Sequence, residues 1–384
     1  MESREGLKWK EIIRELAYQS GFVAVGFTNS EPIAGLEEFL AKRNALGYNT
    51  PFEKSEFSSR VDPKAIWSAC KTVVTLAYPL PLTKKPQEGE GVLARSAVGE
   101  DYHRVLKKAL EKLITSMNEV GWEGESQLQV DTGPLNERAF AVRAGLGWIG
   151  KNQQLIIPKV GSFVALALML LDRELPPDKA PHANQLENKC GECTRCIEVC
   201  PPQILGQKNF QANKCLSYLT QSKEPLTRAQ TALIGTRIFG CDTCQEACPH
   251  NQPFLKRELE HLTEDVNQAK IERDELPNNE DEFLEEGLYR DSEGLHRGTG
   301  EILSQTRKES LSRGVDLWQT LNLTKSTFNQ EWRNSAAGWR GKGVLQRNAY
   351  LALCNLKDPR GEEWIRRRKE EDTLGNSKIW VIIE

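Results

Sequence analysis

The sequence lacks a long apolar run. The longest uninterrupted apolar stretch, residues 163–171, is far shorter than the ~20 residues that a membrane-spanning helix needs. Residues 1–5 contain neither an apolar signal region nor a twin arginine. We therefore expect a cytoplasmic protein that does not associate with a membrane.

The sequence also lacks an excess of either charge. Its 51 Lys and Arg residues nearly balance its 54 Asp and Glu residues, which leaves a formal net charge of −3. This balance excludes a basic field over the whole protein, although a local basic patch can still bind a nucleic acid. A chain of 384 residues is long enough for two or three domains with a substantial core.

Cysteine is plentiful and clustered. Eight of the ten cysteines fall in one segment: Cys190, Cys193, Cys196, Cys200, Cys215, Cys241, Cys244 and Cys248. Cys200 and Cys248 are each followed by proline, and in each case three residues separate the cysteine from a preceding Cys-x2-Cys pair. In two-cluster ferredoxins, a cysteine in this position ligates the other [4Fe–4S] cluster.

The spacing therefore predicts two [4Fe–4S] clusters with crossed ligands. Cluster one takes Cys190, Cys193, Cys196 and Cys248, and cluster two takes Cys200, Cys215, Cys241 and Cys244. Zinc is the main alternative, because two Cys-x2-Cys pairs could form a zinc ribbon, but four cysteines and both Cys-Pro steps would then have no role. A disulfide framework fits a small secreted chain better than this one.

Strands and helices alternate over the first half of the chain. Helical spacing covers residues 7–20, 35–46, 101–120 and 135–144, and apolar or β-branched runs at residues 22–27, 72–78, 127–130, 155–157 and 164–171 predict strands. This alternation favours an α/β (α+β) domain over residues 1–180, ending in a polar linker.

Three further segments follow this domain. Residues 181–254 contain the cysteines and form the expected ferredoxin-like domain. Residues 255–314 are acidic with little apolar periodicity, which favours a solvated insertion. Helical spacing returns over residues 315–384, where residues 344–353 could form the inner helix of a HEAT-like pair.

Several motifs outside the cysteine segment resemble one enzyme family. Residues 130–138 read VDTGPLNER and residues 144–152 read AGLGWIGKN. They are followed by FGCDTCQ at residues 239–245 and by GWRGKG at residues 338–343. Together with RVDP at residues 60–63 and GEDYH at residues 99–103, this combination resembles epoxyqueuosine reductases, in the same order and over nearly the whole chain.

The resemblance implies an activity and a set of cofactors. Members of this family reduce an epoxide on a cyclopentane ring to an alkene, at the wobble position of a tRNA that carries epoxyqueuosine in its anticodon loop. They use cobalamin and two [4Fe–4S] clusters, and cob(I)alamin would supply the two electrons that the clusters deliver singly. The sequence has no Asp-x-His-x-x-Gly cobalamin motif, so the cobalamin prediction and the cobalamin-binding role of residues 1–180 rest on the resemblance.

The resemblance also suggests site residues. Asp131 matches the family's proton donor, and a general acid of this kind would need a pKa raised by burial. The alternative is that Asp131 only caps the helix that begins near Pro134. The other candidates for the cofactor pocket are Arg60, Ser96, Tyr102, Lys151, Asn152, Ser217 and Asp242. His103 is expected to be structural.

A basic patch near Trp339 is the candidate tRNA-binding surface. It contains Arg340, Lys342 and Arg347, which could contact phosphates, while the aromatic ring could stack on a base. The alternative is an ordinary solvated helix face. We expect the protein to be a monomer and to receive electrons from an external flavodoxin- or ferredoxin-like donor.

Two other functions remain open at this point. A reductive dehalogenase would combine cobalamin with two clusters, but it should carry a twin-arginine signal and lack a basic helical region at its C-terminal end. A non-catalytic ferredoxin-type electron carrier would need neither the first 180 residues nor Asp131.

Overall fold

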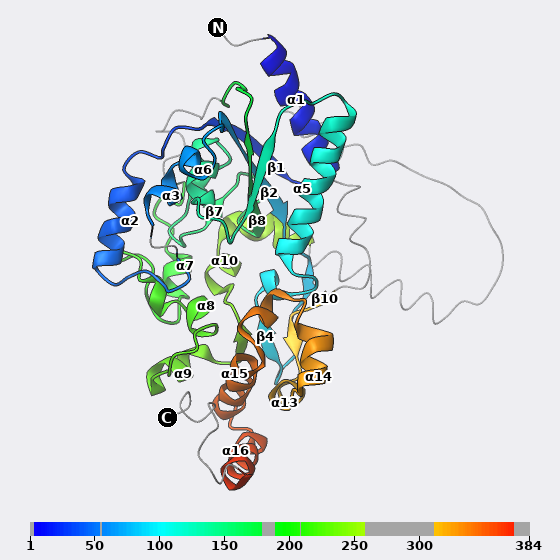
Figure 1. Ribbon diagram of the computed structural model, residues 1–384. Coiled ribbons are helices and arrows are strands. Elements are labelled where there is room, and N and C mark those ends of the chain that lie inside the picture. Colours follow the sequence, from blue (N-terminus) through cyan, green and yellow to red (C-terminus); the bar gives the residue numbers. More distant parts are fainter. Residues whose placement is uncertain (1–3, 54–55, 179–188, 208, 258–310, 372–384) are drawn as a thin grey trace, which may run out of the picture.

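The computed structural model describes residues 4–53, 56–178, 189–207, 209–257 and 311–371 (Figure 1). The insertion expected at residues 255–314 lies, apart from its two ends, outside these residues. Among the described helices, none is both long enough and apolar enough to cross a membrane.

A four-stranded sheet forms the centre of the N-terminal half. Its order is β1 (Ala24–Asn29), β2 (Thr72–Pro79), β8 (Val164–Leu171) and β5 (Ser126–Val130). Every neighbouring pair is antiparallel. Four of the five predicted strands are therefore confirmed in this sheet, although β1 begins two residues later than predicted, and the alternation of helices with strands here builds an antiparallel sheet.

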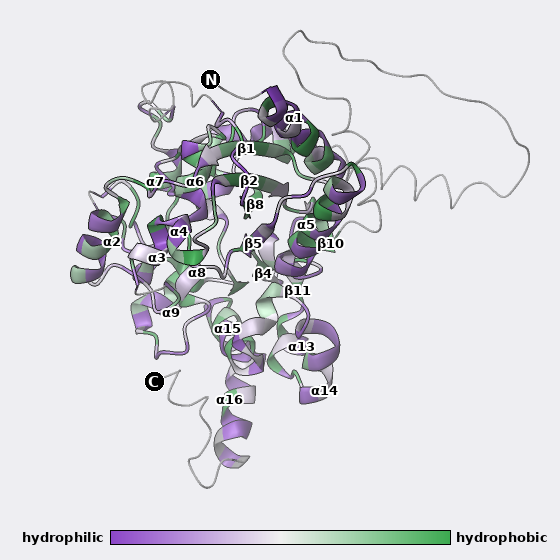
Figure 2. Ribbon diagram, turned by 45° about the horizontal axis from the view of Figure 1, so that its top comes forward, coloured by the Kyte–Doolittle hydropathy of each residue, from purple (hydrophilic) through white to green (hydrophobic). Residues whose placement is uncertain are grey.

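Helices cover both faces of this sheet. Helices α1 (Arg4–Gln19) and α5 (Tyr102–Glu119) pack on one face, where Leu106, Leu110 and Leu113 of α5 join the core that contains Val74 and Leu76. Alternate strand residues point to opposite faces of the sheet. Helix α6 (Glu137–Arg143) packs on the face opposite to α1 and α5, where it contacts the strand residues Val73 and Ala77. Figure 2 shows that β1 and β2 are hydrophobic, whereas α2 (Leu36–Ala45) carries much hydrophilic sequence.

Short elements connect these parts and form the cysteine segment. In the N-terminal half they are α3 (Ser58–Val61), α4 (Pro63–Ile66), β3 (Thr83–Lys84), η1 (Arg95–Ala97), β6 (Trp148–Ile149) and β7 (Leu155–Ile156). In the cysteine segment they are α7 (Arg195–Glu198), η3 (Ala212–Lys214), α8 (Leu216–Leu219), α9 (Arg228–Ile234), α10 (Thr243–Glu246) and η4 (Pro249–Asn251).

A second sheet ties three distant segments together. Its order is β11 (Gly314–Val315), β4 (Gly91–Leu93) and β9 (Arg237–Phe239), so it joins the N-terminal half, the cysteine segment and the C-terminal region. Strand β10 (Leu311–Ser312) pairs with β3 beside it. Leu93, Ile238 and Leu345 belong to one core, so these three segments share their packing.

The C-terminal region predicted at residues 315–384 is helical as far as it is described, and residues 372–384 lie outside the described residues. The described part contains α13 (Leu317–Leu321), α14 (Lys325–Thr327), η5 (Phe328–Trp332), η6 (Ala336–Arg340), α15 (Lys342–Asn355) and α16 (Pro359–Glu371). Leu345, Ala349 and Leu353 lie four residues apart on α15 and are fully buried, so residues 344–353 form a buried helix, while the HEAT-like pair stays a prediction. Trp364 of α16 packs against Tyr350 of α15, with ring centroids 6.0 Å apart.

Candidate functional site

Four of the clustered cysteines share one small cavity. A cavity of about 220 Å³ is lined by Cys190, Cys193, Cys196 and Cys248. Cys196 lies in α7, and Cys248 stands directly before η4, where Pro249 occupies the first turn. Burial raises the pKa of the Cys196 thiol, and the charges of the other three thiols of this set raise it further.

The other four cysteines line a larger cavity, which we call the central cavity. Its volume is about 430 Å³, and Cys200, Cys215, Cys241 and Cys244 all contribute to its wall. Burial, followed by the charges of neighbouring thiols, raises the pKa of Cys215 to about 11. In the described part of the chain, no three Cys, His, Asp or Glu side chains are close enough to hold a single metal ion.

The central cavity also contains Asp131, which follows the end of β5. Its side chain is 56% exposed, and its backbone has φ +48°, a left-handed conformation that is uncommon outside glycine. The hydroxyl of Tyr102 donates a hydrogen bond to Oδ2 of Asp131 at 2.9 Å, and Nε2 of His103 lies 3.2 Å from the same oxygen. Asp131 is therefore open to the cavity and bound to the first turn of α5.

His103 lies between two carboxylates. Its Nδ1 is 2.7 Å from Oδ1 of Asp101, the residue that caps α5, and its Nε2 faces Asp131. The hydrogen bond with Asp131, together with the hydrogen bond and charge of Asp101, raises the pKa of His103 to about 9 despite burial. His103 therefore carries a proton at neutral pH.

The expected pKa of Asp131 was wrong in direction. Burial acts to raise it, but the hydrogen bonds from His103 and Tyr102 outweigh burial and lower the pKa of Asp131 below its usual value. The alternative role as a helix cap is also wrong, because Asn136 caps α6 and accepts a hydrogen bond from the amide of Ala139 at 3.2 Å.

The turn that contains Asp131 is fixed at both ends. Oε1 of Glu137 accepts a hydrogen bond from the backbone amide of Asp131 at 2.6 Å. The side-chain amide of Gln129 makes two hydrogen bonds to the backbone of Leu135, at 2.9 and 3.0 Å. Glu137 also lines the central cavity, and burial followed by the charge of Asp131 raises its pKa to about 8.

Sequence reasoning missed His103, Glu137 and Gln129 as parts of this site. His103 and Glu137 lie inside the motifs GEDYH and VDTGPLNER, but the contact of His103 with Asp131 depends on how α5 meets β5, and that of Glu137 on the turn between β5 and α6. The available signal was a cluster of titratable residues at the start of two helices.

Most of the predicted cofactor-pocket residues line the central cavity. Ser96, Tyr102, Asn152, Ser217 and Asp242 all contribute to its wall. Asn152 is almost completely buried, and its Nδ2 has no hydrogen-bond partner among the described residues. A buried donor without a partner is costly, so Asn152 provides a place for an acceptor on a bound molecule.

Two predicted residues do not line this cavity. The ammonium group of Lys151 donates hydrogen bonds to the carbonyl oxygens of Gly191 at 2.7 Å and Cys193 at 3.0 Å, so it holds the loop around the small cavity. The guanidinium group of Arg60 pairs with Glu53 at 3.1 Å. Both side chains therefore have partners within the protein, and their cofactor-binding roles stay predictions.

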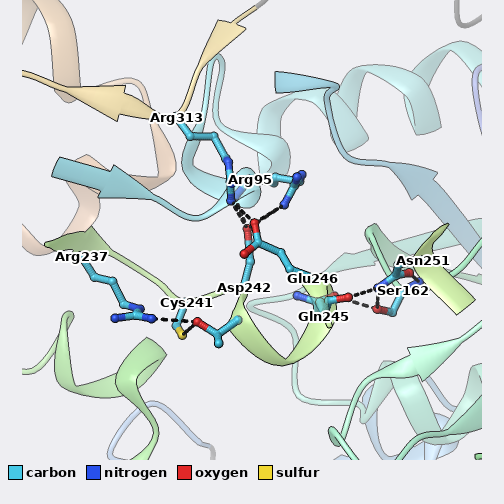
Figure 3. Close-up of polar contacts among 10 residues, drawn as sticks. Arg95, Ser162, Arg237, Cys241, Asp242, Gln245, Glu246, Asn251 and Arg313 are labelled. Carbon is cyan, nitrogen blue, oxygen red and sulfur yellow. Dashed lines mark hydrogen bonds and ion pairs between the residues drawn. The ribbon is translucent and has the colours of Figure 1, made fainter. Parts of the chain in front are cut away.

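Asp242 belongs to a buried group of ionic residues beside the second set of cysteines (Figure 3). Its Oδ2 accepts a hydrogen bond from the backbone amide of Arg95 at 2.7 Å and lies 3.6 Å from the guanidinium group of Arg313. Glu246, one turn further along α10, pairs with Arg313 at 2.7 Å and with Arg95 at 3.1 Å. The carboxylate of Asp242 is therefore engaged with these two arginines.

The predicted basic patch divides into buried and surface residues. Arg347 is only 1% exposed, and its guanidinium group donates to the carbonyl oxygens of Ser222 at 2.6 Å and Leu219 at 3.0 Å. The prediction that Arg347 contacts tRNA is therefore corrected. Arg340 and Lys342 remain partly exposed near Trp339.

Comparisons with known proteins agree with this arrangement. The family described as "Epoxyqueuosine reductase QueG, DUF1730" matches residues 60–132, and the family described as "4Fe-4S double cluster binding domain" matches residues 189–251. The chain therefore contains a domain of the type that binds two [4Fe–4S] clusters.

Curated relatives match most of the chain. The epoxyqueuosine reductase of Bacillus anthracis is 32% identical over 345 residues, which is 88% of this chain and 78% of that protein. The enzyme of Bacillus subtilis is 32% identical over 358 residues, which is 91% of this chain and 80% of that protein.

Solved structures of epoxyqueuosine reductases also match most of the chain. The epoxyqueuosine reductase of Streptococcus thermophilus aligns with a TM-score of 0.74 and 28% identity, over 96% of this chain and 86% of that one. A second one, solved with an epoxyqueuosine-modified tRNA-Tyr stem loop, aligns with a TM-score of 0.72 and 29% identity, over 93% and 84% of the two chains. A Bacillus subtilis structure with its catalytic aspartate loop swung out of the active site aligns with a TM-score of 0.73 and 27% identity, over 96% and 87%.

Proposed function

This chain belongs to the epoxyqueuosine reductase family, and from this premise we propose that it reduces epoxyqueuosine to queuosine at the wobble position of tRNA. The reaction consumes two electrons and two protons. Both carbon–oxygen bonds of the epoxide break, a carbon–carbon double bond forms, and the oxygen leaves as water. The protein must therefore supply single electrons in sequence and hold proton donors next to the epoxide.

The observation that carries this proposal is that one set of four cysteines lines the same cavity as Asp131. We assign cluster two to Cys200, Cys215, Cys241 and Cys244, and cluster one to Cys190, Cys193, Cys196 and Cys248. Electrons from an external flavodoxin- or ferredoxin-like donor would pass from cluster one to cluster two, which adjoins the reaction cavity. A simple electron carrier would have no use for Asp131 in that wall.

Cobalamin is the cofactor that we propose for the central cavity. The wall combines apolar side chains, such as Val164 and Leu166, with the polar side chains of Ser96, Asn152 and Ser217. The free Nδ2 donor of Asn152 fits an amide carbonyl at the edge of a corrin ring. When bound, this cofactor would supply a centre able to deliver two electrons to the substrate.

Asp131 and His103 form the proton-donating pair in this proposal. Asp131 is the member of the pair that is open to the cavity, and His103 holds a proton 3.2 Å away at neutral pH. An epoxide oxygen is a poor leaving group until it is protonated, so the proton held by His103 moves to the carboxylate of Asp131 and from there to the epoxide oxygen. Tyr102 keeps the carboxylate of Asp131 in position through its hydroxyl group.

The tRNA is bound by the C-terminal region in this proposal. Residues 315–384 would form a HEAT-like helical unit whose surface residues Arg340 and Lys342 contact phosphates. The target base must leave the anticodon loop to enter the central cavity, as bases do in other enzymes that modify them. The protein would act as a monomer.

The test is turnover by the reconstituted protein. The chain would be purified anaerobically, supplied with iron, sulfide and hydroxocobalamin, and mixed with a reductant and a stem-loop that carries epoxyqueuosine. Mass spectrometry should show the loss of one oxygen atom from the modified nucleoside. An unchanged nucleoside, with both clusters and cobalamin present, would overturn the proposal.

A further inference from the structure

Three aromatic rings from distant segments meet at the surface near η6. The ring of Phe52, in the loop after α2, lies 5.2 Å from Tyr218 of α8 and 5.1 Å from Trp339 of η6, measured between centroids. Trp339 is 54% exposed and Phe52 is 38% exposed. A single exposed apolar side chain is ordinary, but two exposed rings in contact form a patch, and such patches mark binding surfaces.

The protein holds Trp339 and the neighbouring Arg340 in fixed positions. The indole nitrogen of Trp339 donates to Oε1 of Gln221 at 2.9 Å, and Nε of Arg340 donates to the backbone carbonyl of Gln221 at 2.7 Å. The guanidinium group of Arg340 lies 4.7 Å from the ring centroid of Trp339 and 5.0 Å from that of Phe52. An exposed ring and a cation are thus fixed side by side.

This surface borders the central cavity. Leu216 and Ser217 line that cavity, and Tyr218 is the next residue of the same short helix. Phe52 is also held near the site, because its neighbour Glu53 pairs with Arg43 at 2.7 Å and with Arg60 at 3.1 Å. The backbone of Arg60 in turn accepts a hydrogen bond from Asn136, the cap of α6.

We propose that Phe52, Trp339 and Arg340 form a stacking site for an unpaired base of the tRNA anticodon loop, beside the nucleotide that is being reduced. This inference rests on the proposed function and adds the place where a neighbouring base is held. Aromatic faces and guanidinium planes are the groups on which proteins stack splayed RNA bases. The positive charge of Arg340 also suits RNA, whereas an apolar protein partner would gain little from it.

The site explains how the target nucleotide is presented. A base that leaves the loop loses its stacking neighbours, and the remaining bases must find new ones. If Trp339 stacks on an adjacent base, it restores part of the lost stacking and holds the anticodon loop at the opening of the cavity. Trp339 would then favour the splayed form of the loop over the closed one.

The experiment uses the full-length reconstituted protein and an epoxyqueuosine stem-loop that carries fluorescent 2-aminopurine next to the modified base. Binding to the unaltered protein should quench the fluorescence, because stacking on indole quenches it. Trp339→Leu should abolish this quenching and weaken binding by roughly 5- to 100-fold, the range expected for one stacked base. Phe52→Leu should act in the same direction.

The controls separate stacking from folding. Phe39 lies on α2 and is 55% exposed, close to the value for Trp339, so Phe39→Leu removes a comparable ring elsewhere and should change nothing. Trp339→Phe should restore most of the binding, because it retains a flat aromatic face. The iron content of each variant shows that the cysteine segment is intact.

The outcomes also distinguish the two proposals. If the unaltered protein neither binds nor reduces the stem-loop, the proposed function fails and the stacking site fails with it. If the unaltered protein reduces the stem-loop but Trp339→Leu binds it as tightly and with the same quenching, only the stacking site is overturned. The exposed rings would then serve a protein contact or the local fold.

Discussion

The backbone amide of Asp131 donates a hydrogen bond to Oε1 of Glu137 over 2.6 Å. This contact holds a residue whose backbone is in the left-handed region, at the point where the strand β5 ends. A strained backbone of this kind persists only where its surroundings fix it, and such positions are common at active sites. Glu137 is therefore a positioning residue for Asp131.

Replacing Glu137 separates this positioning role from its charge. Glu137→Gln keeps an oxygen acceptor for the amide of Asp131, whereas Glu137→Ala removes it. We expect Glu137→Ala to lower kcat about tenfold, the equivalent of one hydrogen bond, with little change in KM for the stem-loop. Glu137→Gln should restore most of the rate. Equal losses in both variants would show that the carboxyl group itself, and not the hydrogen bond, matters.

The raised pKa of Glu137 also predicts a dependence of stability on pH. The folded-state pKa of about 8 lies above the ordinary value of 4.5, so the folded protein binds this proton more tightly than the unfolded chain does. Its contribution to the free energy of unfolding is complete below about 4.5 and is lost as the pH rises through about 8. In thermal unfolding, Glu137→Gln should therefore lose less stability than the unaltered protein when the pH is raised across this range.

Asp131→Asn tests the proton donor directly. The amide keeps the shape of the side chain but cannot transfer a proton, so turnover should fall by about 10²–10⁴ while both clusters stay in place. Asp172→Asn is the matched control, because Asp172 also follows a strand end and accepts a backbone hydrogen bond, from Glu125, without lining the central cavity. Unchanged turnover in Asp131→Asn would remove Asp131 from the mechanism.

The pH profile tests the role of His103. His103 is protonated below its pKa of about 9 and loses that proton as the pH rises through it, so turnover should decline on the alkaline side. His103→Gln can still donate a hydrogen bond to Asp131 but cannot replace its proton. This variant should be slower at neutral pH and should show no decline near pH 9. A decline that persists in His103→Gln would have to come from another group.

Substitution of Arg347 and substitution of the surface cations Arg340 and Lys342 should have opposite effects on stability and on RNA binding. Arg347→Met leaves the carbonyl oxygens of Leu219, Thr220 and Ser222 without their charged donor, so it should lower the free energy of unfolding by about 2–5 kcal/mol. The salt dependence of tRNA binding should not change, because Arg347 is buried.

Neutralising the surface cations should affect RNA binding and not stability. The double substitution of Arg340 and Lys342 by glutamine should weaken stem-loop binding and reduce the slope of log K against log salt by about one for each phosphate that is no longer neutralised. Chemical denaturation should show a stability near that of the unaltered protein. An unchanged slope would mean that these two cations form only a solvated face.

The sequence predicted the parts of the protein that depend on local spacing. Helix α5, strand β8 and helix α15 follow from apolar periodicity, and the cysteine spacing alone grouped Cys200 with Cys241 and Cys248 with Cys190. These groupings match the two cavities that the cysteines line.

The side-chain environment could not be predicted in the same way. The lowered pKa of Asp131 depends on His103, a residue on another element, and the direction reversed because two donors outweigh burial. Lys151 and Arg347 lie in motifs rich in glycine or charge, where a cationic side chain suggests contact with a bound molecule. Their partners are backbone carbonyls from segments far along the chain, which spacing alone does not indicate.

In our proposal, a cobalamin and the second [4Fe–4S] cluster share the cavity that contains Asp131. The most direct measurement is the iron and corrinoid content of the protein after anaerobic reconstitution with iron, sulfide and hydroxocobalamin, read together with its visible spectrum. We expect about eight irons and one corrinoid per chain. About eight irons with no corrinoid would contradict it and would leave a two-cluster electron carrier as the better description.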